Sequence, residues 1–132
     1  MKGLPFAFLI AGAISVTIGM VWGIQMSATH DHTLAPAHAH LNLLGWVSFS
    51  IFAFFYHLVP HAAEGYLPKA HFAVAVTGLI ILVPGIALAI QGNGEMLAKI
   101  GSVLSLASML LFVWVVLRAG RQRRASAKMK IA

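Results

Sequence analysis

The sequence predicts an all-α membrane protein whose single domain contains four transmembrane helices. Three observations lead to this prediction. Of the 132 residues, 60% are hydrophobic and only 9% are charged, whereas charged residues make up about a quarter of an ordinary soluble domain. Four apolar runs each approach the roughly 20 residues that a helix needs to cross the hydrocarbon core. Most of the positive charge follows the last of these runs, as is typical of a cytoplasmic flank.

The residue inventory limits the chemistry that the protein can perform. The chain has no cysteine, which excludes disulfides, thiolate metal sites and cysteine nucleophiles. Its 3 acidic residues are too few for a paired-carboxylate hydrolase or a hard-cation cage. Histidine, present in 7 copies, is therefore the strongest metal-ligand type available.

The first span is predicted over residues 4–27. Its apolar run is longer than the roughly 7–15 residues of a signal-peptide core, so we expect a retained helix. Small residues recur within it at Gly12, Ser15, Gly19 and Gly23. This pattern either forms a face for close helix packing or reflects the general abundance of glycine in membrane helices.

The next part of the chain is rich in histidine. His30 and His32 lie in a connection with polar and turn-forming residues, so they are either surface histidines or part of a metal-capture site or proton relay. The second span is predicted over residues 39–59, and His38 and His40 lie where it begins. Because an imidazole at membrane depth is costly without a partner, this His-x-His pair is a candidate site.

Two further spans complete the predicted fold. The third is predicted over residues 71–91, with a kink at Pro84. A glycine-rich turn at 92–95 connects it to the fourth span, residues 97–119. The basic segment 120–132 is predicted to be a cytoplasmic tail on anionic membrane lipid, and not a nucleic-acid-binding region.

The distribution of Lys and Arg predicts the orientation. A basic C-terminus lies in the cytoplasm, and four spans then place the N-terminus in the cytoplasm as well. We therefore expect a multi-pass protein of the bacterial inner membrane. In this orientation His38 and His40 lie near the outer surface, whereas His57, His61 and His71 lie near the inner one.

The spacings between histidines predict different kinds of site in different parts of the chain. Residues two apart on a helix point about 200° apart, so His38 and His40 are expected to face two different neighbours and not to share one ion. His57 and His61 have the four-residue spacing of helical metal sites, although the second span is predicted to end between them. Together with His71 they form either a metal site or a group of interfacial histidines bonded to water and headgroups.

The second span also carries a longer motif. It consists of the His-x-His pair followed by Gly45-Trp46-Val47, Phe52, Tyr56 and Leu58-Val59-Pro60. This run resembles a haem-bearing helix of heme-copper oxidase subunit I, with the cbb-type oxidases as the most similar members and the nitric oxide reductases as relatives. In that family the first histidine of the pair is the proximal ligand of the high-spin haem, and the second binds the low-spin haem. The resemblance implies haem b ligated by His38 and His40, with copper as a further metal of the family.

The resemblance also has consequences for assembly. Family members have about twelve spans, arranged as three arcs of four helices around a pseudo-threefold axis, so a four-span chain is expected to form a twelve-helix homotrimer that resembles oxidase subunit I. The sequence has no separate three-histidine copper set of the family's kind, and oxygen reduction therefore does not follow from the resemblance alone.

Three functions agree with these observations. The first is a membrane haem protein that transfers electrons or handles oxygen or nitric oxide, with an electron-donor protein as its partner; as an enzyme it would be an oxidoreductase of cytochrome oxidase or nitric oxide reductase type. The second is a protein that binds or transports copper or zinc through its histidines. The third is a non-catalytic structural subunit whose histidines make hydrogen bonds between helices.

Overall fold

The computed structural model describes the backbone of residues 1–129 and the side chains of residues 1–121, and this part of the chain is helical throughout apart from short connections. The second span consists of three consecutive segments of different helix type. The helices are α1 (Leu4–Thr29), α2 (Ala35–His40), the π-helix η1 (Leu41–Ser48), α3 (Phe49–Leu58), the short 3₁₀-helix η2 (Pro60–Ala63), α4 (Leu67–Ile90) and α5 (Met96–Met129).

Four helical segments are long and apolar enough to cross a membrane, which confirms the predicted four-helix architecture. They are Leu4–Thr29, Ala35–Leu58, Leu67–Ile90 and Met96–Arg121. In lipid the backbone N–H and C=O groups must bond within the segment, and an uninterrupted helix is the simplest structure that achieves this.

Proline sets the starts of the second and third spans, which differ from the predicted ones. The second and third spans each begin four residues earlier than predicted, at Ala35 and Leu67, and both have proline in the first turn. Proline fits there because the N–H group that it lacks would have no intrahelical partner anyway. α4 continues as a helix on both sides of Pro84. α5 extends to Met129, so the predicted basic tail begins as a continuation of the last span.

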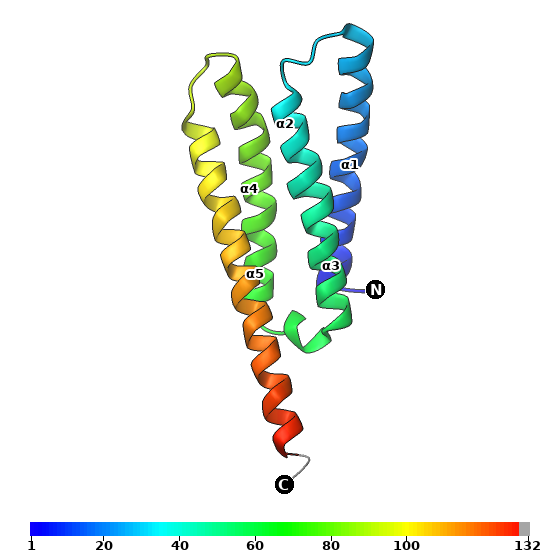
Figure 1. The fold of residues 1–132 in the computed structure, drawn as a ribbon, viewed down its shortest axis with the longest axis vertical. Helices are drawn as coiled ribbons and strands as arrows, with labels where there is room; N and C mark the ends of the chain where they lie inside the picture. Colours follow the sequence, from blue (N-terminus) through cyan, green and yellow to red (C-terminus); the bar gives the residue numbers. More distant parts are fainter. Residues whose placement is uncertain (130–132) are drawn as a thin grey trace.

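The four spans run alternately up and down, and the N-terminus lies at the same end of the bundle as the C-terminal half of α5 (Figure 1). We call this the terminal end; it also contains η2. The opposite end, which we call the hairpin end, contains the connections at residues 30–34 and 91–95. Gly92 and Gly94 turn the chain there with φ angles of 77° and 98°, a region that residues with a Cβ atom rarely occupy.

Close backbone contacts hold the helices in two pairs, α1 with the second span and α4 with α5. A methyl group built on Gly12 would lie 3.3 Å from the carbonyl oxygen of Gly45. One built on Gly101 would lie 2.5 Å from the Cα atom of Leu82. The small-residue face of α1 therefore packs against the second span of the same chain, because only glycine allows the two backbones to approach so closely.

Candidate functional site

The His-x-His pair lies at a change of helix type. His38 and His40 belong to the last turn of α2, and the following eight residues form the π-helix η1. In a π-helix each N–H bonds to the carbonyl five residues earlier, and such segments are frequent at functional sites. The Ser48 hydroxyl repeats this spacing, since it donates to the Leu43 carbonyl oxygen at 3.0 Å. The sequence does not indicate this segment, because hydrophobic periodicity does not distinguish a short π-helix from an α-helix.

His38 faces α1 and is half-buried. Its ring meets the Trp22 ring edge-on, with centroids 6.1 Å apart. A methyl group on Gly23 would come within 3.4 Å of the His38 Cε1 atom, so Gly23 provides the space for this ring. The Asn42 amide nitrogen lies 3.2 Å from His38 Nε2 and also donates to the His38 carbonyl oxygen at 2.9 Å. His38 is thus held by contacts within one chain.

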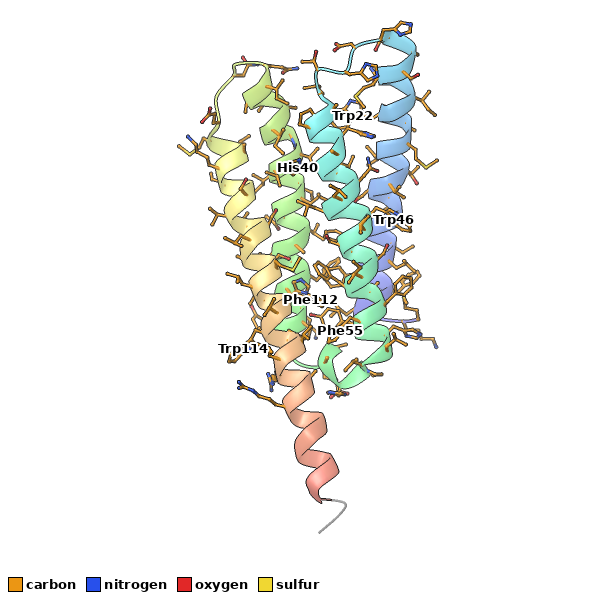
Figure 2. The ribbon with its side chains drawn as sticks, viewed as in Figure 1. Trp22, His40, Trp46, Phe55, Phe112 and Trp114 are labelled. Atoms are coloured by element: carbon orange, nitrogen blue, oxygen red, sulfur yellow. The ribbon has the colours of Figure 1, made fainter. Side chains whose placement is uncertain are left out.

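His40 lies on the other side of the second span. Figure 2 shows it toward α4, whereas Trp22 lies between the second span and α1. The side chain is exposed, and its Nδ1 atom lies 2.8 Å from the Pro36 carbonyl oxygen. Because a carbonyl oxygen only accepts hydrogen bonds, Nδ1 carries the proton of the neutral ring, and Nε2 of that ring is left with a free lone pair. The two histidines point to different sides, as their spacing predicts.

The loop histidines lie outside the spans. His30 and His32 are both exposed at the hairpin end. Between them, the Asp31 carboxylate accepts hydrogen bonds from the Thr33 side chain and from the Thr33 backbone N–H, the latter at 2.9 Å, and these bonds lower the pKa of Asp31. The carboxylate is therefore engaged with Thr33 in a local turn; the charge of His32 lowers the pKa of Asp31 further, but no hydrogen bond or ion pair in the described residues joins the carboxylate to either histidine ring.

A second polar site lies buried near the terminal end, where His71 of α4 has no exposed surface. The Tyr56 hydroxyl of α3 lies 2.9 Å from His71 Nδ1. Rings from the other two spans complete the surroundings: the centroid of Phe8 lies 5.1 Å from that of His71, and the centroid of Phe112 lies 5.6 Å from it. Figure 2 shows Phe112 and Phe55 pointing toward each other between α5 and α3. All four spans therefore meet around one imidazole.

The donors and acceptors around Tyr56 and His71 determine which atom donates the hydrogen bond between them. Tyr56 O–H donates to His71 Nδ1, because the reverse arrangement would leave the buried hydroxyl hydrogen with no acceptor. His71 Nε2 then carries the single N–H proton of the neutral ring, and this buried atom has no hydrogen-bond partner among the described residues. Residue spacing along the chain does not predict this pairing, which joins residues 15 positions apart on two different helices.

The histidines near the terminal end do not gather into one site. His57 and His61 are exposed, whereas His71 is enclosed by aromatic rings. Within residues 1–121 no group of three or more His, Cys, Asp or Glu side chains is placed to hold a metal ion. The structure therefore does not assemble the metal site that we considered for His57, His61 and His71. His71 packs among aromatic rings inside the bundle and has no exposed surface, so it cannot join the two exposed histidines.

Fold and site together define the class of protein: an all-α chain with four helices able to cross a membrane, a His-x-His pair at the hairpin end and a buried Tyr–His pair at the terminal end. Comparisons of the chain with protein-family models, curated proteins and solved structures give no match.

Proposed function

We propose that the protein is a membrane haem protein in which His40 supplies the axial nitrogen to the iron of haem b. The proposal includes the bacterial cytoplasmic membrane as the location, with both termini on the cytoplasmic side. Haem iron supplies electron transfer and the binding of diatomic gases such as oxygen or nitric oxide. The proposal starts from the resemblance of the second span to the haem-bearing helix of oxidase subunit I, and one feature of His40 supports it.

That feature is the fixed tautomer of His40. Iron binds neutral imidazole through an unprotonated nitrogen, and ligating histidines usually donate their other N–H to a carbonyl or carboxylate. The bond of 2.8 Å from His40 Nδ1 to the Pro36 carbonyl oxygen meets this requirement within one turn of helix. In the neutral ring this bond selects the tautomer whose lone pair is on Nε2, and the ring is exposed. The chemistry of the donor therefore fits haem iron.

His38 is the candidate for a second ligand, but its ring is engaged differently. The Asn42 amide approaches its Nε2 atom at 3.2 Å, and this nitrogen accepts the N–H of the amide. To ligate iron, His38 must exchange the amide for the metal. We therefore assign the stronger ligand role to His40 and expect Asn42 to control the availability of His38.

The surroundings of His40 bear on assembly. Beyond it the second span exposes a series of large apolar side chains, namely Leu43, Val47, Ile51, Phe54 and Leu58. His40 is thus exposed on a single chain, where a porphyrin would be covered on one face only. A closed homotrimer places another copy opposite this side, and the proposal therefore includes a twelve-helix trimer.

The test is a reduced-minus-oxidised absorption spectrum of the purified full chain after incubation with haem. We expect the wild type to show a Soret band and stoichiometric iron, and His40→Ala to lose most of both. His57→Ala is the matched control, because it removes another exposed histidine of the same span and should leave the spectrum unchanged.

Three results would overturn the proposal. They are an absent Soret band in the wild type, equal haem retention in wild type and His40→Ala, and elemental analysis that finds copper or zinc in place of iron. The third result would favour histidine-based metal binding.

A further inference from the structure

Two hollows meet at the terminal end of the bundle, on either side of His61. The first is a polar pocket of about 320 Å³ between η2, the start of α4 and residues 115–119 of α5, and its lining includes His61, Glu64 and Arg118. The second is a groove of about 450 Å³ between α3 and α5, and its lining includes Phe55 and Leu58. His61 and Ala119 belong to both linings, so the polar pocket and the apolar groove are adjacent.

We propose that these two hollows bind one phosphatidylethanolamine molecule. The phosphate of the lipid contacts Arg118 and His61, its ammonium group contacts Glu64, and one acyl chain follows the groove past Phe55 and Leu58. We name these hollows together the lipid site. The proposal does not depend on haem binding, because the site lies at the opposite end of the molecule from His40 (Figure 2).

The charges in the pocket select the headgroup. An Arg guanidinium binds phosphate oxygens through two parallel hydrogen bonds, so Arg118 provides the phosphate contact. Glu64 in the same lining provides a carboxylate for a cation. Phosphatidylethanolamine carries both charges in one headgroup, whereas phosphatidylglycerol would bring only a phosphate close to this carboxylate. A headgroup with one positive and one negative charge therefore complements the pocket best.

The depth of the site also matches a phospholipid. Arg118 lies near the end of the membrane-crossing segment Met96–Arg121. One turn before it, Trp114 is 56% exposed and points away from the bundle (Figure 2), as aromatic residues do at the membrane interface. The polar pocket thus lies at headgroup level, and the groove beside it lies at the same level of α5 and reaches back along α3 to Phe55.

The dimensions of the site support a chain-bearing ligand. Leu58 in the groove lining is 78% exposed, so the apolar surface at the end of α3 remains to be covered by something apolar. The polar pocket alone, at about 320 Å³, is at the lower end of the roughly 300–1,000 Å³ range of small-ligand sites. It therefore accommodates a headgroup, and the acyl chain requires the adjoining groove.

The experiment is native mass spectrometry of the full chain in detergent, titrated with dioleoylphosphatidylethanolamine or dioleoylphosphatidylglycerol. We expect the wild type to retain the ethanolamine lipid at a concentration about tenfold lower than the glycerol lipid, which corresponds to about 1.4 kcal/mol. Arg118→Gln should weaken retention of both lipids about tenfold. Glu64→Gln should remove the preference between them. Lys99→Gln, which removes a charge near the hairpin end of α5, is the matched control and should behave as the wild type.

Several outcomes would refute the lipid site. Equal retention of the two lipids by the wild type would remove the headgroup assignment. Equal retention by Arg118→Gln and Lys99→Gln would show that the lipid is bound elsewhere. Displacement of the lipid by an equimolar amount of soluble phosphorylethanolamine would show that the groove contributes nothing. Circular dichroism of each variant verifies that the helices remain folded, and Arg118→Lys, which retains the charge without the paired hydrogen bonds, should lie between wild type and Arg118→Gln.

Discussion

Substitution of Tyr56 by Phe tests the buried pair at the centre of the four spans. Tyr56 is 1% exposed and His71 is 0% exposed, so water cannot replace the lost hydroxyl without opening the core. The variant retains the aromatic ring, which stacks on Phe8 with centroids 5.8 Å apart. The change therefore removes one hydrogen bond and little packing.

The structure sets the size of the effect. Tyr56→Phe leaves Nδ1 of His71 without its partner, next to an Nε2 atom that already has none. A buried polar atom left in this state costs about 1–3 kcal/mol of unfolding free energy. Loss of the whole ring in Tyr56→Ala should cost more, because a large-to-small core change adds a cavity at about 3–5 kcal/mol.

The assay is equilibrium unfolding of the purified protein in mixed micelles, followed by circular dichroism. The double variant Tyr56→Phe with His71→Leu is the informative control, since it removes both polar partners and should recover most of the stability lost in the single variant. Two results would refute the hydrogen bond as a stabilising contact: a Tyr56→Phe variant within about 0.5 kcal/mol of wild type, or a double variant less stable than Tyr56→Phe.

Three further predictions use the same unfolding assay. Gly101→Leu should destabilise the protein by more than about 2 kcal/mol, because even a methyl group there would lie 2.5 Å from the Leu82 Cα atom; wild-type stability would contradict the observed packing. Ser50→Ala should leave stability unchanged or raise it by up to about 1 kcal/mol, since the buried hydroxyl has no partner among the described residues; a marked loss would reveal a hidden bond. The ion pair of 2.9 Å between Glu95 and Lys99 lowers the pKa of Glu95, so any stabilisation is present at neutral pH and lost as the pH falls through that lowered pKa. Because both side chains are 69% exposed, Glu95→Gln should have no measurable effect at neutral pH; a clear loss of stability would contradict this.

The sequence by itself determined the four spans, their approximate bounds and the divergence of the histidine pair. Long apolar runs predict membrane helices with confidence because lipid offers the backbone no other hydrogen-bond partner. The divergence of His38 and His40 follows from helix geometry alone. Even the shifted starts at Ala35 and Leu67 have a local cause, the proline in the first turn.

Tertiary structure decided which faces of these helices meet. The spans are apolar on nearly all sides: α1 buries Phe8 yet exposes Ile14 and Ile18, so no hydrophobic stripe indicates the inner face. The partner of His71 and the lipid site depend on how separate helices pack, and the spacing of residues along one helix does not contain that information. In a membrane the apolar side chains fit lipid and protein equally well, so close glycine contacts and buried hydrogen bonds select the arrangement.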